Sequence, residues 1–128
     1  MRLFIAIDLN ELRDYFIELQ NAISEILKDS KLNFTKSFHL TLKFLGDVQP
    51  TQAEKVIAIL KKIKLDRISV FLDELGFFPS ENCIRVFWLG LRPEEKILEL
   101  QKNIDESLKD MFKKEKEFKS HITLARVK

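Results

Sequence analysis

The chain is poor in the residues that cross-link or interrupt a fold. Its 128 residues include one cysteine, three glycines and three prolines. A single cysteine excludes an intrachain disulfide and a cysteine-based metal cluster, and so few glycines and prolines leave little room for flexible linkers. No apolar run approaches the length of a membrane span, and the first one, residues 3–7, is too short for a signal peptide. A cytoplasmic protein without membrane attachment is expected.

No strong excess of one charge is present either. Charged residues make up 33% of the chain, apolar residues make up 45%, and the formal net charge is +2. This composition is typical of a folded globular protein, and the net charge alone does not indicate nucleic-acid binding. Lysines gather at 61–64 and 113–119, where a solvated helix end is favoured over a phosphate-attracting rim. At this length we expect one bilobal domain over residues 1–128.

Histidine is scarce as well, and each of the two histidines is the first residue of the same four-residue motif. His39 begins His-Leu-Thr-Leu and His121 begins His-Ile-Thr-Leu. On average composition, a histidine is followed by x-Thr-Leu roughly once in a hundred cases or fewer, so the repetition is hard to ascribe to chance. Because imidazole titrates near physiological pH, two histidines brought together can serve as one acid and one base.

The histidine motifs belong to a longer internal repeat. Arg-Leu-Phe at 2–4 is matched by Arg-Val-Phe at 85–87, Glu-Leu-Gln at 18–20 recurs at 99–101, and Lys-Ser at 36–37 recurs at 119–120. These shifts of 83, 81 and 83 residues agree with the 82 residues that separate the histidines. Strand, long helix and strand with His-x-Thr-Leu thus occur twice. The repeat predicts an α+β fold with two pseudo-symmetric lobes, each contributing one histidine.

Hydrophobic periodicity places the elements of this fold. Helices are predicted to begin after Asp8 or Asn10, at Pro50 and at Pro93. Phe87 and Trp88 lie in an apolar strand and are expected in the core. The predicted strands are 3–7, 38–48, 67–75, 83–91 and 120–127, with the main loop at 76–82.

The spacing inside each motif creates one polar face. Residues two apart in a strand point the same way, so His39 shares a face with Thr41, and His121 shares a face with Thr123. The apolar residues between them point into the packing. Two such strands related by a twofold axis would bring both imidazoles and both hydroxyls to one cleft.

The chemistry suited to this set is displacement at a phosphodiester. One neutral imidazole accepts a proton from the attacking oxygen, while the other, protonated, gives a proton to the departing oxygen. The threonine hydroxyls donate hydrogen bonds to non-bridging phosphate oxygens. The scheme needs no metal or other cofactor, and neither motif contains an acidic residue to complete a metal site. A surface His-Thr pair without catalytic function is the ordinary alternative for one motif, but the duplication favours catalysis.

At this point the chain resembles a known family. Its segments 2–7, 39–46, 78–80 with 85–90, and 121–126 are similar, in sequence and order, to the motifs of the RNA 2′,3′-cyclic phosphodiesterases. These are also called 2′-5′ RNA ligases and belong to the two-histidine (2H) phosphoesterase superfamily. The resemblance implies a bilobal fold with antiparallel sheets flanked by helices around a central cleft. It also implies hydrolysis of a 2′,3′-cyclic phosphate at an RNA end to a 2′-phosphate.

The same resemblance implies roles for single residues. His39 and Thr41, with His121 and Thr123, would be the catalytic pairs, and family precedent makes His121 the base that activates water and His39 the acid. The family also joins tRNA halves through a 2′-5′ linkage in vitro. RNA with a cyclic phosphate end, tRNA halves included, is therefore the expected partner of a monomeric protein.

The residue five places after each histidine is ambiguous. The family places an aromatic and an arginine near the substrate, at the positions of Phe44 and Arg126. Simple alternation sends both side chains to the face opposite the histidines, and only a bulge or twist would bring them round. For Phe44 core packing is favoured, and for Arg126 substrate contact and a surface ion pair are equally favoured.

Two other functions stay open. A related enzyme would use the same histidines on ADP-ribose cyclic phosphate or 2′-5′ oligoadenylate, and a non-catalytic protein would bind RNA ends without turnover. Members of the family usually continue well past the second motif, whereas this chain ends at Lys128. A shortened carboxyl-terminal part is therefore expected, with the last strand as an uncovered edge.

Overall fold

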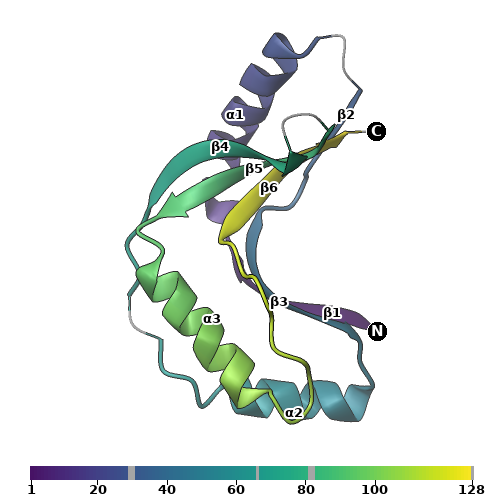
Figure 1. Ribbon diagram of the computed structural model, residues 1–128, viewed down its shortest axis with the longest axis vertical. Coiled ribbons are helices and arrows are strands. Elements are labelled where there is room, and N and C mark those ends of the chain that lie inside the picture. The colour runs from purple at the N-terminus through teal and green to yellow at the C-terminus, as the bar shows by residue number, and fades with distance from the viewer. Residues whose placement is uncertain (29–30, 66, 81–82, 128) are drawn as a thin grey trace. The chain divides into compact units, whose positions relative to one another are not determined.

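Strands and helices are mixed along the chain (Figure 1). The computed structural model describes residues 1–28, 31–65, 67–80 and 83–127. No helix within these ranges is long and apolar enough to cross a membrane. The elements in chain order are β1 (Arg2–Asp8), the 3-10 helix η1 (Asn10–Leu12), α1 (Arg13–Ile26), β2 (Leu32–Phe34), β3 (His39–Asp47), α2 (Pro50–Leu60), β4 (Phe71–Ser80), β5 (Cys83–Arg92), α3 (Glu95–Ser107) and β6 (His121–Val127).

The strands form two sheets, and their pairing is antiparallel. β1 pairs with β3, and the other four strands form a sheet in the order β2-β6-β5-β4. β6 lies between β2 and β5 and is antiparallel to both, so the expectation that the last strand is an uncovered edge is wrong. In the smaller sheet, Val48 N donates to Met1 O at 2.7 Å and Leu9 N donates to Phe38 O at 2.9 Å, so β1 and β3 run in opposite directions. The predicted α+β class with antiparallel sheets is confirmed.

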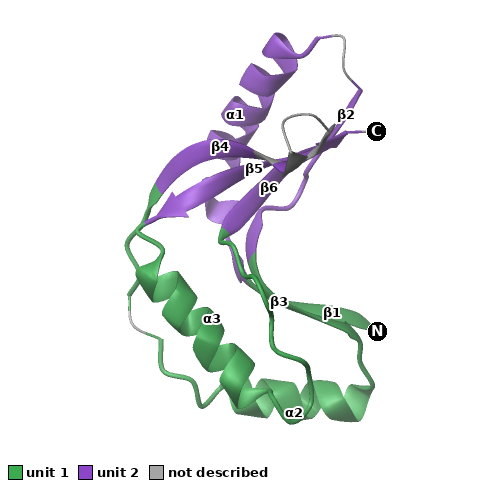
Figure 2. Cartoon of the chain, in the orientation of Figure 1, with its two compact units in different colours: residues 1–6, 41–71, 93–120 green, residues 7–40, 72–92, 121–128 purple. Residues whose placement is uncertain are grey.

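The chain divides into two compact units (Figure 2). Unit 1 consists of Met1–Ala6, Thr41–Phe71 and Pro93–Ser120, and unit 2 consists of Ile7–Leu40, Leu72–Arg92 and His121–Lys128. Each unit takes segments from both halves of the internal repeat. Unit 2 holds α1 from the first half and β6 from the second, whereas unit 1 holds α3 from the second half and most of β3 from the first. Both histidines belong to unit 2, so the expectation of one histidine in each lobe is wrong for these units.

The reason for this division lies in what each helix supports. α1 contacts β6 within unit 2, and α3 is hydrogen-bonded to β3 within unit 1. Each helix therefore packs beneath the histidine strand of the other half of the repeat. The two helices bury equivalent positions, 81 residues apart: Phe16, Gln20 and Ile23 in α1, and Ile97, Gln101 and Ile104 in α3.

The prediction of a loop at 76–82 is wrong for residues 76–80, which belong to β4. Within this strand, position 76 has room only for glycine. A Cβ built on Gly76 would lie 2.2 Å from Cζ2 of Trp88, so the indole requires a residue without a side chain. The rest of the predicted loop, 81–82, lies outside the described residues. β2, of only three residues, was not predicted, because its register depends on pairing with β6.

Candidate active site

β6 contains a bulge just after the second His-x-Thr motif. Trp88 of β5 lies opposite Thr123, but Phe87, the residue before Trp88, lies opposite Ala125. Leu124 is therefore an additional residue in β6 with no counterpart on β5. Such a bulge locally interrupts the alternation of side chains between the two faces of a strand.

The bulge decides which side chains of β6 are accessible. His121 and Thr123 are half-buried, Leu124 and Ala125 are both buried, and Arg126 is exposed. Regular alternation would have buried Arg126 together with Leu124. Because of the additional residue, Arg126 is accessible instead, like His121 and Thr123.

β3 repeats this burial pattern position by position. His39 and Thr41 are half-buried, Leu42 and Lys43 are both buried, and Phe44 is 71% exposed. The prediction that Phe44 packs in the core is therefore wrong. The physical reason is the break in alternation at Leu42 and Lys43, where the lysine, 2% exposed, is buried in place of the aromatic ring.

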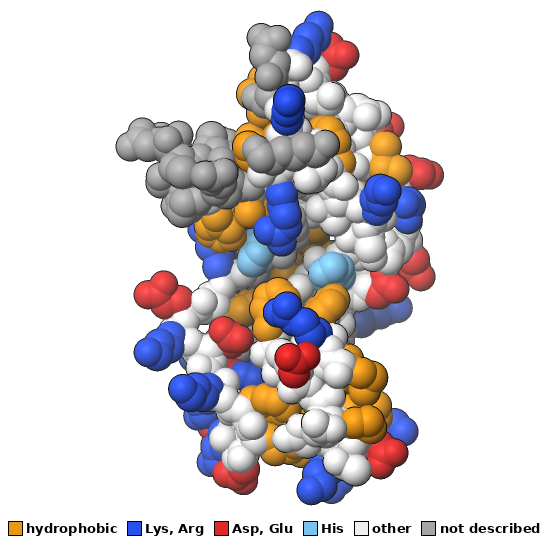
Figure 3. All heavy atoms as spheres, turned by 90° about the vertical axis from the view of Figure 1, so that its right-hand side faces the viewer, with side chains coloured by type: hydrophobic (Ala, Val, Ile, Leu, Met, Phe, Trp, Pro, Cys, Tyr) orange, Lys and Arg blue, Asp and Glu red, His pale blue; other side chains and the backbone are white. Residues whose placement is uncertain are grey.

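The histidines lie on one face of the molecule (Figure 3, pale blue), and both belong to unit 2. The pairing of β2 explains how the first histidine comes near β6. β2 is antiparallel to β6, and Thr35 N donates to Leu124 O at 3.0 Å. Beyond Thr35 the chain is therefore directed toward the end of β6 at which His121 lies, and His39 follows four residues later.

Unit 2 brings together four of the six predicted site residues. It contains His39, His121, Thr123 and Arg126, whereas Thr41 and Phe44 are counted with unit 1 because β3 passes from one unit to the other after Leu40. Thr41 is nevertheless only two residues from His39 on the same strand.

Asn10 holds the backbone that leads into His39. Its Oδ1 accepts a hydrogen bond from Phe38 N at 2.8 Å, and its Nδ2 donates to Ser37 Oγ at 3.4 Å. The sequence offered Asn10 as a helix cap, but α1 begins only at Arg13 and has no side-chain cap. The amide instead fixes the approach to the first histidine.

His121 lies against two aromatic rings. Its ring centroid is 5.2 Å from that of Phe78 and 6.2 Å from that of Trp88, at interplanar angles of 88° and 67°. Phe78 and Trp88 are themselves stacked at 5.0 Å. Trp88 is 7% exposed, which confirms that it is buried, but it is buried beside the histidine. Phe78 was missed because its segment was assigned to a loop.

Replacing Gly76 by alanine is expected to disturb these rings. Because the new Cβ would overlap the indole of Trp88, the ring must move, and the free energy of unfolding should fall by about 1–3 kcal/mol. The emission of Trp88, the single tryptophan, should change as well. Urea unfolding followed by fluorescence measures both effects.

Gly90→Ala is the matched control for this substitution. A Cβ on Gly90 would lie 3.4 Å from Cζ3 of Trp88 and 3.6 Å from Glu74 O, which the surroundings can accommodate. Equal losses of stability in the two variants would contradict the steric explanation.

Lys43 ends in a buried polar cluster that sequence reasoning missed. Its Nζ lies 2.5 Å from Asp105 Oδ1 and 2.6 Å from Lys113 O. Asp105 Oδ2 accepts hydrogen bonds from Gln101 Nε2 at 2.9 Å and from Glu115 N at 3.0 Å. Burial raises the pKa of Asp105, but the hydrogen bonds from Lys43, Gln101 and Glu115 outweigh it, so the pKa lies below its ordinary value.

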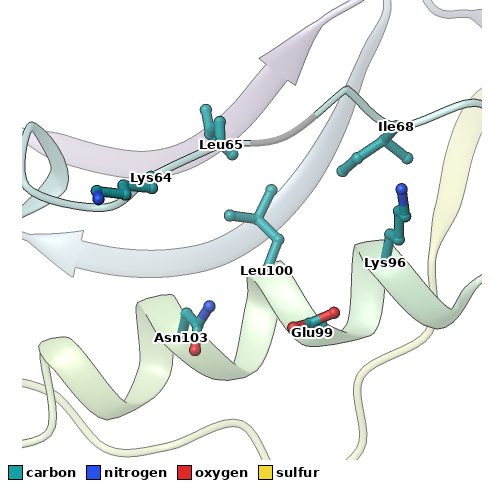
Figure 4. A pocket seen from close by; sticks show the side chains of 7 residues that line it. All are labelled: Lys64, Leu65, Ile68, Lys96, Glu99, Leu100 and Asn103. Atoms are coloured by element: carbon teal, nitrogen blue, oxygen red, sulfur yellow. The ribbon is translucent and has the colours of Figure 1, made fainter.

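The described part of unit 1 also has a small pocket of about 80 Å³ beside α3 (Figure 4). Neither histidine lines it, so it is not the candidate site. Among the described residues, no group of three or more His, Cys, Asp or Glu side chains is placed to hold a metal ion. The pocket is lined by Lys64, Leu65, Ile68, Lys96, Glu99, Leu100 and Asn103.

An α+β fold that presents two His-x-Thr strands defines a phosphoesterase of the two-histidine class, and comparison with known proteins agrees. Residues 7–88 match the family described as LigT like phosphoesterase. The RNA 2′,3′-cyclic phosphodiesterase of Methanocaldococcus jannaschii is 35% identical over 130 aligned positions, which cover 100% of this chain and 72% of that protein. The protein of that name from Thermotoga maritima is 33% identical, with 100% and 71% covered. The chain belongs to the LigT-like phosphoesterase family.

Solved structures support the same assignment. The crystal structure of Escherichia coli LigT in apo form has a TM-score of 0.79 at 28% identity, covering 98% of this chain and 71% of that one. The crystal structure of TT0787 of Thermus thermophilus has a TM-score of 0.78 at 27% identity, covering 99% and 74%. The resemblance inferred from the motifs and the fold class are thus confirmed.

Proposed function

We propose that this protein hydrolyses the 2′,3′-cyclic phosphate at the end of an RNA chain and leaves a 2′-phosphate. The observation that carries the proposal is the placement of both histidines on one face (Figure 3). Each is half-buried and is followed, two residues later, by a half-buried threonine on a strand with the same burial pattern. Membership of a family whose relatives are RNA 2′,3′-cyclic phosphodiesterases supports the substrate.

The proposed reaction is an acid–base displacement at phosphorus. Neutral His121 takes a proton from water as the water oxygen attacks the phosphorus atom. The bond between phosphorus and the 3′-oxygen breaks, and protonated His39 gives its proton to that oxygen. The Thr41 and Thr123 hydroxyls donate hydrogen bonds to the non-bridging oxygens, on which negative charge accumulates. Proton exchange with solvent then restores both histidines.

Two accessible side chains are proposed to bind the substrate. Phe44 presents an exposed ring 5.9 Å from that of Phe4, which offers a surface on which a nucleobase can stack. Arg126 is exposed on the strand of the second motif, and its guanidinium suits a phosphate or ribose oxygen. Both lie five residues after a histidine, where two successive buried residues precede them and leave them accessible.

The test is product formation from an oligonucleotide that ends in a 2′,3′-cyclic phosphate, in the presence of a chelator. A 2′-phosphate product supports the proposal. Binding without turnover by the folded protein would favour an RNA-end-binding protein. Faster turnover of ADP-ribose cyclic phosphate or 2′-5′ oligoadenylate would replace the substrate but keep the mechanism. tRNA halves, added in a separate reaction, test for 2′-5′ joining.

The rate of hydrolysis plotted against pH is expected to be bell-shaped. One imidazole must be charged and the other neutral in the same turnover. The rate therefore falls at low pH, where both imidazoles are protonated, and at high pH, where both are neutral. The measurement is kcat/KM across the range in which histidine titrates. A profile that rises to a plateau at high pH would show that no imidazolium is needed as the acid.

A further inference from the structure

We propose that Gln20 and Gln101 are positioning residues, each of which holds the break in side-chain alternation in the histidine strand of the opposite half of the repeat, at 124–125 in β6 and at 42–43 in β3. Gln20 would thereby set the position of Arg126, and Gln101 that of Phe44. The consequence for catalysis rests on the proposed function, whereas the positioning itself does not.

The two side chains make equivalent hydrogen bonds from equivalent places. Gln20 of α1 donates from Nε2 to Leu124 O at 3.0 Å, and Gln101 of α3 donates from Nε2 to Leu42 O at 3.4 Å. Each acceptor is the third residue after a histidine, at the point where alternation breaks. Gln20 and Gln101 are themselves 81 residues apart, in the Glu-Leu-Gln match of the repeat.

Both amides are buried, at 6% exposure for Gln20 and 4% for Gln101. A primary amide in an apolar helix stripe is costly unless it is hydrogen-bonded, so its presence at both equivalent positions needs a reason. Each amide also has a second bond that anchors it. Gln20 Nε2 donates to Thr35 O at 2.8 Å and Gln101 Nε2 to Asp105 Oδ2 at 2.9 Å.

The residues next to the two glutamines also indicate that each helix supports the histidine strand of the other half of the repeat. In unit 1 the buried position after the acceptor is Lys43, and α3 supplies Asp105, four residues after Gln101. In unit 2 the position after the acceptor is Ala125, and the residue four places after Gln20 is the exposed, uncharged Ser24. The carboxylate is thus found on the helix that faces the lysine, not on the helix of the lysine's own half.

The break in alternation has a direct effect on the site. Two successive buried residues at 42–43 and at 124–125 are what leave the next side chain accessible. Without the amide that donates to the carbonyl of Leu42 or Leu124, we expect regular alternation to be favoured. Regular alternation would turn Phe44 or Arg126 toward the packed face.

The experiment uses Gln20→Met and Gln101→Met, each combined with Phe44→Ala or Arg126→Ala in double-mutant cycles. Asn21→Met and Asn103→Met, at exposed positions of the same helices, are the controls. kcat and KM are measured with a cyclic-phosphate oligonucleotide well below the melting temperature of every variant. We expect kcat/KM to fall on the order of ten- to a hundredfold in the glutamine variants, mainly through KM, and to stay unchanged in the controls.

The pattern of coupling tests the assignment. Gln101→Met should add little to Phe44→Ala, and Gln20→Met should add little to Arg126→Ala, while the two crossed pairs multiply. Coupling in the crossed pairs instead would overturn the exchange between halves. A lowered melting temperature with unchanged kcat/KM would overturn the positioning role and leave only a structural one.

A second readout does not require activity. The ¹³C chemical shift of the Leu124 carbonyl should move in Gln20→Met only, and that of Leu42 in Gln101→Met only. If the wild type shows no turnover, the proposed function fails but these shifts still test the positioning, and unmoved shifts would refute it. Should a methionine variant not fold, Gln→Asn, which keeps the amide but withdraws it from the carbonyl, takes its place.

Discussion

Replacing either histidine by alanine is expected to abolish measurable hydrolysis while the fold is retained. A general acid or base typically contributes about a hundred- to ten-thousand-fold to the rate, so His39→Ala and His121→Ala should each lower kcat by that order. Both side chains are half-buried at the edge of the packing, so their truncation should leave the circular dichroism spectrum and the melting temperature close to those of the wild type.

The double variant His39→Ala/His121→Ala tests whether the two groups act in one step. If they do, removing the second imidazole costs little once the first is gone. A double variant that is slower by the full product of the single effects would argue against concerted action.

Thr41→Val and Thr123→Val should lower kcat less than the replacement of either histidine. Thr51→Val, at an exposed threonine of α2, should leave kcat unchanged.

The two strands of the candidate site and their packed faces could be predicted from the sequence. The duplicated His-x-Thr-Leu phrase identifies the two strands, and the period of two correctly assigns the residues between His39 and Thr41, and between His121 and Thr123, to the packing. The α+β class follows from strands and helices that alternate in the repeat. These inferences need only the spacing of neighbouring residues and the comparison of the two halves of the sequence.

What sequence reasoning missed depends on partners far away in the chain. Phe44 was assigned to the core because nothing local indicates the break in alternation in β3, which shows only in the burial of Lys43. Lys43 reads as a solvated lysine until Asp105, 62 residues later, is placed beside it. The Glu-Leu-Gln match was visible, but not that Gln20 supports the strand of the other half.

Lys43→Met is expected to produce the largest loss of stability of any substitution proposed for this protein. The side chains of Lys43 and Asp105 are 1% and 8% exposed, and removal of the lysine leaves the buried carboxylate without its counter-ion. Breaking a buried ion pair in this way typically costs about 3–5 kcal/mol of the free energy of unfolding. Urea unfolding at neutral pH measures this loss. Lys109→Met is the control, because it breaks an equally direct pair with Glu106 that is about half exposed, and its effect should be much smaller.

The pH dependence of that loss identifies its cause. In the wild type the pKa of Asp105 is lowered on folding, so its contribution to stability is complete above the ordinary carboxyl pKa and is lost as the pH falls through the lower, folded value. Without Lys43, its hydrogen bond and its charge no longer lower the pKa of Asp105, so this pKa is higher than in the wild type and protonation relieves the unpaired charge. The difference in unfolding free energy between the wild type and Lys43→Met should therefore shrink as the pH falls. It should also shrink at neutral pH in Lys43→Met/Asp105→Leu, where the carboxylate is absent. A difference that stays constant with pH and survives in the double variant would mean that lost packing, rather than the buried carboxylate, makes Lys43 indispensable.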